Sequence, residues 1–148
     1  MSFDTERQMV DTIKKSDYLH QIMTGGPSIL EEEVDGYFGI PDLVIVRKTN
    51  KKHVSYAYEA KLSNWNRALY QAFRYKAFVN KSFVIMDHDR IKPALANLNK
   101  FSDAKVGLLS IENSGNVHIH YNPRNESPYS PYMGAKFNNR IAKEVYYI

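Results

Sequence analysis

The chain has 148 residues, 43% of them hydrophobic and 24% charged, a balance typical of a single globular domain. It contains no cysteine, which excludes disulfides and thiolate metal sites, so a metal ion would need oxygen or imidazole ligands. The formal net charge of +4 is compatible with a polyanionic partner but does not demand one.

The N-terminal region predicts an amphipathic helix in a protein of the cytoplasm. The opening sequence MSFDTERQMV lacks the pattern of a signal peptide, and no apolar run approaches the roughly 20 residues of a membrane span. We therefore expect cytoplasmic localisation and no membrane partner. Within residues 4–23, Met9, Val10 and Ile13 recur at helical spacing after Asp4, a suitable N-cap, and the sequence TGGPS ends the helix.

Three strands are expected next, and the last two of them form a hairpin. Residues 29–39, ILEEEVDGYFG, are a short strand candidate, whereas residues 41–48 and 54–62 are richer in β-branched and aromatic side chains. The polar sequence TNKK connects these two stronger strands, which indicates a turn between them.

The second half of the chain alternates helices and strands. Residues 63–81 have a helical period, with Ser63 or Asn64 as the N-cap. The elements that follow are a strand, a helix and two strands around a Ser-Gly turn, at 82–87, 90–104 and 106–121. Strand, helix and strand in succession need a parallel crossover, so the expected sheet is mixed.

The hairpin carries three ionisable residues in an otherwise apolar setting. Side chains alternate along a strand, so Glu59 and Lys61 lie on one face. A register centred between residues 50 and 51 makes three pairs of residues face each other: Val46 and Ser55, Val44 and Ala57, and Asp42 and Glu59.

Two facing carboxylates predict a cation between them. Cβ atoms of directly opposed residues lie about 4.5–5.5 Å apart, where two negative charges repel. A divalent metal such as Mg²⁺, which prefers oxygen ligands, would relieve that repulsion between Asp42 and Glu59. Lys61 reaches the same place with a positive charge and three hydrogen-bond donors, which suit a water molecule or a phosphate oxygen.

The pattern of PD at 41–42 and ExK at 59–61 resembles the PD-(D/E)xK nuclease superfamily, in particular its small stand-alone members. The resemblance covers most of residues 4–124, including a Q-x-x-x-Y spacing in the helix and the closing hairpin. It implies an α/β fold with a three-layer α/β/α restriction-endonuclease-like core, in which helices flank a mixed central sheet. Residues 1–121 would form the nuclease-like domain, and residues 122–148 an irregular C-terminal extension packed on it.

The resemblance also implies a function, that of a Mg²⁺-dependent deoxyribonuclease. Mn²⁺ would substitute for Mg²⁺ as its metal ion. Asp42 and Glu59 would hold the metal, the backbone carbonyl of Ala60 would complete its coordination, and Lys61 would orient the attacking water or stabilise developing charge. The expected substrate is double-stranded or branched DNA, and whether the enzyme cuts ends or internal bonds stays open.

Further residues follow from the same resemblance. Gln71 and Tyr75 on the helix would support catalysis. An additional acid would come from the first helix as Glu6 or from the first strand as Glu33, and Glu6 is favoured for the metal. The expected nucleic-acid-binding residues are Asn64, Arg67 and Arg74. For Arg67, which shares a helix face with Gln71 and Tyr75, a plain solvent-facing role is an equal alternative.

Other interpretations of the sequence lead to different functions. The three hairpin charges could be a structural ion pair at a sheet edge, and the fold could serve as a catalytically silent nucleic-acid-binding or assembly module. His118 and His120 alternate on a strand as a metal pair would, but no third ligand is evident in the sequence. A homodimer is expected for cutting both strands. Its contact would use the helix around Leu95 and Leu98 or the aromatic tail, whose tyrosines are Tyr129, Tyr132, Tyr146 and Tyr147.

Overall fold

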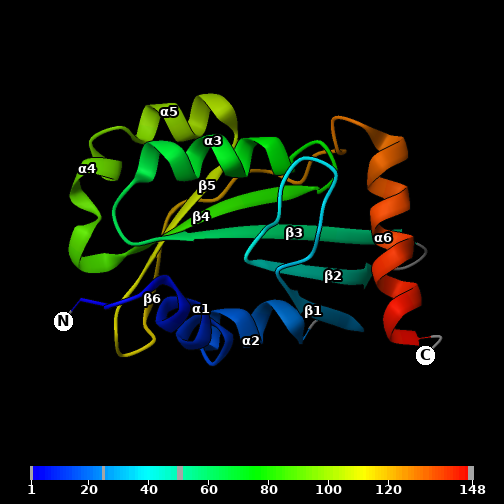
Figure 1. Ribbon diagram of the computed structural model, residues 1–148, viewed down its shortest axis with the longest axis horizontal. Coiled ribbons are helices and arrows are strands. Elements are labelled where there is room, and N and C mark those ends of the chain that lie inside the picture. Colours follow the sequence, from blue (N-terminus) through cyan, green and yellow to red (C-terminus); the bar gives the residue numbers. More distant parts are fainter. Residues whose placement is uncertain (1, 25, 50–51, 147–148) are drawn as a thin grey trace.

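A six-stranded mixed sheet forms the centre of the fold (Figure 1). The computed structural model describes residues 2–24, 26–49 and 52–146. In sheet order, the strands are β1 (Ser28–Glu32), β2 (Leu43–Thr49), β3 (Lys52–Lys61), β4 (Lys81–Asp87), β5 (Gly107–Ile111) and β6 (Val117–Tyr121). The central pairs β3–β4 and β4–β5 are parallel, and the other neighbouring pairs are antiparallel. The mixed sheet predicted from the sequence is confirmed.

Helices cover both faces of this sheet. One face carries α1 (Glu6–Lys14) and α2 (Asp17–Met23), and the other carries α3 (Trp65–Tyr75), α4 (Lys92–Leu95) and α5 (Leu98–Ala104) (Figure 1). A short 3₁₀ turn, His88–Arg90, follows β4. The three-layer α/β/α arrangement is therefore confirmed. No helix in the described part of the chain is long and apolar enough to cross a membrane.

The two helical layers bury two separate apolar cores. The α3-side core contains Val44 and Val46 of β2, whereas the α1-side core contains Leu43 and Ile45 of the same strand. Alternate residues of β2 thus enter opposite cores, which explains why its sequence is continuously apolar. Burial on both faces also shows that the charged hairpin is not a free sheet edge, because β1 pairs with β2 along its length.

Two predicted helices are each divided in the structure. The helix expected over 4–23 breaks after α1, because the Ser16 side chain accepts a hydrogen bond from Leu19 N and begins α2. The N-cap of α1 is Thr5 rather than Asp4. The helix expected over 90–104 consists of α4 and α5. Asn64 caps α3, as one of the two candidates predicted.

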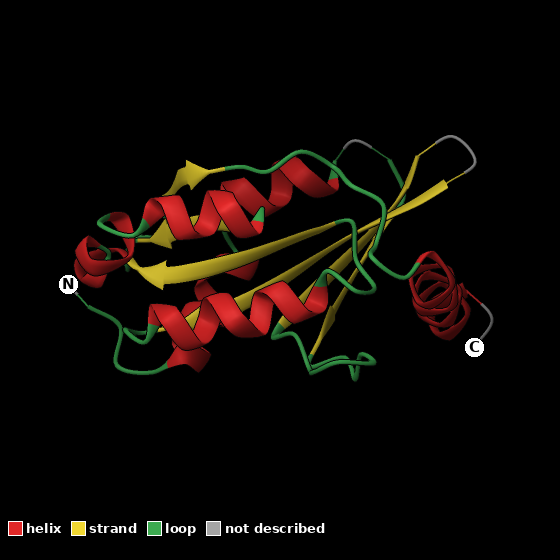
Figure 2. Cartoon of the chain, turned by 90° about the horizontal axis from the view of Figure 1, so that it is seen from above, coloured by secondary structure: helices red, strands yellow, loops and turns green. Residues whose placement is uncertain are grey.

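The C-terminal extension is partly helical, so the expectation of an irregular segment over 122–148 is wrong for its second half. Helix α6 (Pro131–Tyr146) lies at one end of the sheet, apart from the other helices (Figure 2). It buries Phe137 and Ile141, four residues apart, in the α3-side core. Gly134, Asn138 and Asn139 interrupt the helical pattern in the sequence, because glycine and asparagine favour helices weakly.

The first half of the extension is tied to the end of α3 through Lys76. This lysine is only 2% exposed. Its ammonium donates hydrogen bonds to Glu126 Oε1 at 2.9 Å and to the Ala104 carbonyl at 3.4 Å. The Lys76 carbonyl accepts a hydrogen bond from Tyr129 N at 2.9 Å. The extension therefore packs on the same domain.

Candidate active site

The hairpin has the register predicted from its sequence. Val44 faces Ala57 and Val46 faces Ser55, and the ladder ends with Leu43 opposite Tyr58. Asp42 lies one residue before β2, where its backbone N–H donates to the Tyr58 carbonyl at 3.0 Å. Continuing the register by one residue brings Asp42 opposite Glu59, on the face that β2 and β3 turn toward α3.

Asp42 is held in place by the backbone of the neighbouring strand. Its Oδ2 accepts a hydrogen bond of 2.8 Å from the Ala60 N–H. Its side chain is partly buried. Burial raises the pKa of Asp42, the Ala60 hydrogen bond lowers it, and the negative charge of Glu6 raises it again. This carboxylate is thus fixed in orientation but lacks enough stabilising partners for its charge.

Glu59 lies deeper, with only 5% of its surface exposed. Burial raises its pKa to about 7, and the nearby charge of Asp42 acts in the same direction. The Tyr75 hydroxyl donates a hydrogen bond of 2.6 Å to Glu59 Oε1 and opposes this shift. Near neutral pH, Glu59 can therefore hold or release a proton.

Tyr75 connects helix α3 with the carboxylates. Its hydroxyl oxygen also lies 3.2 Å from the Ile40 carbonyl oxygen. When Glu59 is protonated it can donate a hydrogen bond to the tyrosine, and the tyrosine can then donate its own hydrogen bond to the Ile40 carbonyl. Burial raises the pKa of Tyr75, so the hydroxyl stays neutral and keeps donating. The position predicted as a supporting residue is thus in direct contact with a predicted metal ligand.

Both candidates for an additional acid lie near Asp42. Glu6, the first residue of α1, accepts a hydrogen bond of 3.2 Å from Leu62 N through its Oε2, and its charge raises the pKa of both Asp42 and Glu59. Glu33 has a left-handed backbone, with φ of 50°, and raises the pKa of Asp42 more weakly. Glu6 acts on both carboxyls, and the choice of Glu6 over Glu33 as a metal ligand stays a prediction.

Lys61 completes the charge arrangement. Its positive charge lowers the pKa of both Asp42 and Glu59. Among the described residues, it makes no ion pair or hydrogen bond through its side chain. Gln71 lies one helical turn before Tyr75 on the same face of α3, and its buried Oε1 has no hydrogen-bond partner in the described part of the chain. The Lys61 ammonium is therefore free to contact a substrate or a water molecule, whereas the Gln71 oxygen is enclosed by the protein.

The three predicted nucleic-acid-binding residues are exposed but lie outside this group of contacts. Asn64 uses its side chain to cap α3, accepting a hydrogen bond of 3.2 Å from Arg67 N. The Arg74 guanidinium lies 5.9 Å from the centre of the Tyr70 ring. Arg67 faces solvent near the start of α3. These positions present positive charge on the outer surface of α3.

The carboxylates fit a hard divalent cation. The hydrogen bonds of Asp42 and Glu59 each occupy one oxygen, so each carboxylate keeps a second oxygen without a hydrogen bond from the described residues. An all-oxygen donor set suits Mg²⁺ or Mn²⁺. Within the described ranges, no group of three or more histidine or acidic side chains is arranged to hold a metal ion. A cation would therefore rest on this carboxylate pair, with backbone or water oxygens completing its coordination.

The histidine pair noted in the sequence gains a third member in the structure. His88 stacks on His118 with ring centres 4.0 Å apart, and His88 Nδ1 and His120 Nε2 each lie 2.7 Å from Ser110 Oγ. The three rings are nearly parallel, within 14° of one another. His88 and His120 thus share a hydrogen-bond partner in buried Ser110, whereas His118 Nε2 lies 2.8 Å from Glu112 Oε2. Among the described residues, this cluster is not arranged to hold a metal ion.

Comparison with known proteins gives little information on identity. No protein-family model and no curated protein matches the sequence. Among solved structures, the fold is similar to that of SfsA from Pyrococcus furiosus in complex with Ca²⁺, with a TM-score of 0.40 and 13% sequence identity. The match covers 79% of this chain and 63% of that chain, so it spans less than two thirds of SfsA. We assign no activity from this similarity.

Proposed function

We propose that the protein is a Mg²⁺-dependent nuclease that hydrolyses phosphodiester bonds in DNA. The observation that carries this proposal is the position of Asp42 beside Ala60 and Glu59, on one face of the hairpin, with the charge of Lys61 acting on both carboxyls. A buried pair of acids with one cationic side chain is costly for stability. A catalytic role gives a reason for that cost.

Each residue has a distinct part in this mechanism. A bound Mg²⁺ would polarise the phosphodiester and lower the pKa of a coordinated water. Asp42 and Glu59 would hold the cation, and the Tyr75 hydrogen bond keeps one Glu59 oxygen fixed. Lys61 would donate hydrogen bonds to the attacking water or to the charge that develops on the phosphate. On α3, the unpartnered Gln71 Oε1 would accept a hydrogen bond from a water molecule enclosed next to it.

The direct test is cleavage of linear, circular, branched and single-stranded DNA with Mg²⁺, Mn²⁺ or a chelator. We expect cleavage with either metal, loss of cleavage in the chelator, and loss in Asp42→Asn. The matched control is Asp103→Asn, which makes the same change at an exposed site on α5. DNA binding without any metal-dependent cleavage would overturn the proposal and favour the catalytically silent module.

The proposed enzyme is a homodimer when it cuts both strands of a duplex, since each chain carries one site and the two strands are related by a twofold axis. Exposed aromatic rings mark the surface for a second copy. Tyr70 and Phe73 of α3 are 64% and 41% exposed, and the Phe73 ring lies 5.9 Å from that of Tyr129 in the extension. We call these three residues the α3 aromatic patch.

The patch partly replaces the surface expected from the sequence. Leu95 is 36% exposed, but Leu98 packs against the α3-side core and contributes little to an outer surface. Tyr132, also expected in the contact, is exposed on α6. The expected tail residue Tyr147 lies outside the described residues, as does the side chain of Tyr146.

A further inference from the structure

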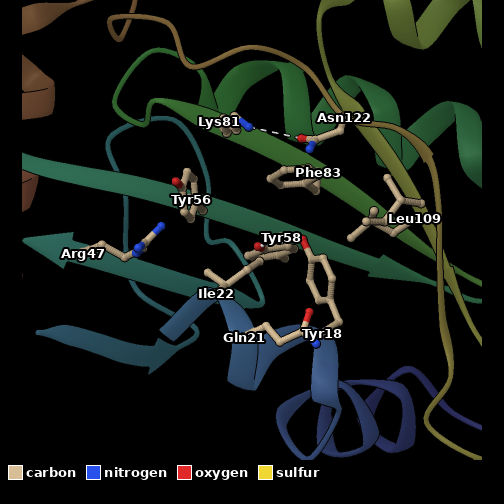
Figure 3. Close-up of a pocket in the computed structure, with 11 residues that line it drawn as sticks. Tyr18, Gln21, Ile22, Arg47, Tyr56, Tyr58, Lys81, Phe83, Leu109 and Asn122 are labelled. Carbon is tan, nitrogen blue, oxygen red and sulfur yellow. Dashed lines mark hydrogen bonds between the residues drawn. The ribbon is translucent and has the colours of Figure 1, made fainter. Parts of the chain in front are cut away.

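A pocket lies on the face of the sheet that α2 covers (Figure 3), and the carboxylates belong to the opposite face. Its volume is about 370 Å³, within the range of small-molecule sites in proteins. Helix α2 forms one wall through Tyr18, and the sheet forms the floor through Tyr56, Tyr58 and Phe83. We call it the tyrosine pocket. Because these side chains belong to the α1-side core and its edge, the tyrosine pocket is separate from the candidate active site.

The floor and wall of the tyrosine pocket are rigidly packed aromatic rings. Tyr58 and Phe83 stack with ring centres 5.0 Å apart, and Tyr56 meets Phe83 edge to face at 6.5 Å. Tyr18 meets Tyr58 edge to face, and the hydroxyl oxygens of these two tyrosines are 3.2 Å apart. Tyr56, Phe83 and Tyr58 are only 8%, 4% and 1% exposed, so the ring that a ligand could contact over the widest area is that of Tyr18, which is partly buried.

The rim of the tyrosine pocket carries positive charge with no acid to balance it. Arg47 and Lys81 are among its eleven lining residues, all described, and none of the eleven is an aspartate or glutamate. The Lys81 ammonium donates to Asn122 Oδ1 at 3.1 Å and lies 5.9 Å from the centre of the Tyr56 ring. Arg47 makes no ion pair or side-chain hydrogen bond with the described residues. An anionic group is the complement of this rim.

We propose that the tyrosine pocket binds a mononucleotide. The base would pack between the Tyr18 ring and the aromatic floor, and the phosphate would accept hydrogen bonds from Arg47 and Lys81 at the rim. Aromatic side chains favour contact with a base, and a guanidinium binds phosphate oxygens in a bidentate manner. The pocket holds one planar ring with one attached anion but is far too small for a duplex. This inference does not depend on the nuclease proposal.

The test is calorimetric titration of the full chain, in chelator, with the four 5′-mononucleotides, their nucleosides and inorganic phosphate. We expect one-to-one binding of at least one mononucleotide, at least tenfold tighter than its nucleoside and than phosphate. Arg47→Gln should weaken that binding at least tenfold. The matched control is Lys48→Gln, which removes the same charge from the next residue of β2, where the side chain points to the opposite face.

Three results would overturn the proposal. The first is that no mononucleotide binds at millimolar concentration, and the second is that phosphate alone binds as tightly as the mononucleotide. The third is that Arg47→Gln and Lys48→Gln weaken mononucleotide binding equally. Circular dichroism of both variants confirms that they fold. Repeating the titration with Asp42→Asn distinguishes the two sites, since mononucleotide binding to the tyrosine pocket should persist when the candidate active site is disabled. Loss of binding in that variant would also count against a separate pocket.

Discussion

The hydroxyl of Tyr75 lies 2.6 Å from Oε1 of Glu59, so a helix of one layer is joined directly to a buried carboxylate of the sheet. These residues are 16 positions apart in the chain and meet because α3 folds back over β3. A hydrogen bond to a charged acceptor is about twice as strong as one between neutral groups. The tyrosine therefore favours the charged form of Glu59, which is the form that a cation needs.

Replacing Tyr75 by phenylalanine should make Glu59 harder to ionise. The lost hydrogen bond to a charged group contributes about 1.5–3 kcal/mol, which corresponds to a rise of about 1–2 units in the pKa of Glu59. NMR titration of the glutamate carboxyl carbons measures this directly. Tyr37→Phe is the matched control, because the buried Tyr37 hydroxyl has no hydrogen-bond partner among the described residues. An unchanged Glu59 pKa in Tyr75→Phe would contradict the assigned role.

Glu59→Gln should stabilise the metal-free protein at high pH. Burial raises the pKa of Glu59 in the folded protein to about 7, from 4.5. Between these two pH values, the folded form therefore keeps a proton that the unfolded form has released. Stability of the natural protein therefore falls as pH rises through this window. The variant should gain up to about 3 kcal/mol above pH 7 and almost nothing near pH 4.5.

Denaturant unfolding at several pH values in chelator measures this gain. Asp103→Asn serves as the control for removing an exposed carboxylate. A gain that is independent of pH would show that packing, and not the buried charge, limits stability at Glu59. Adding Mg²⁺ should stabilise the natural protein and leave Glu59→Gln unchanged.

Lys61→Ala should slow cleavage while leaving DNA affinity nearly intact. Removing one group that stabilises charge in a transition state typically costs about 100- to 1,000-fold in rate. One lysine among 20 basic residues contributes at most about one unit to the salt dependence of DNA binding. Lys52→Ala, an exposed site at the other end of β3, is the control. Equal losses of affinity and turnover would assign Lys61 to DNA binding instead.

Light scattering at several protein concentrations and moderate salt should give the mass of two chains. Tyr70→Lys in the α3 aromatic patch should shift the protein toward the mass of one chain, because it puts a charge in the contact. Ile119→Lys on β6 is the control, because this exposed apolar residue lies beside the tyrosine pocket and outside both the patch and the aromatic tail. A mass of one chain throughout would refute the dimer and favour cleavage of single strands or ends.

The sequence predicts the register of the hairpin because the information is local. The pairing of Thr49 with Lys52 continues into the predicted register, and alternation then assigns Asp42 and Glu59 to one face. The contact between Glu6 and the Leu62 N–H joins residues 56 positions apart, and no sequence pattern specifies it. The tyrosine pocket was not predicted for the same reason, because its residues come from α2 and from five strands or their ends.

Helix boundaries were predicted less well where packing overrides local preference. Ser16 followed by Asp17 is a cap signal that the sequence does contain, and it divides the N-terminal helix. For α6, the burial of Phe137 and Ile141 stabilises a helix whose glycine and asparagines disfavour one. Such tertiary stabilisation is not visible in residue order.

The buried ammonium of Lys76 makes the extension part of the same cooperative unfolding unit as the sheet. Glu126, the acid that neutralises it, follows the last strand. A truncation at residue 121 would remove both Glu126 and the Tyr129 ring, whose centre lies 4.9 Å from the Lys76 ammonium, and so would take away the partners of a buried charge. The end of the last strand is therefore an unfavourable place to divide this chain, because the C-terminal end of the helix that carries Tyr75 packs on residues beyond it.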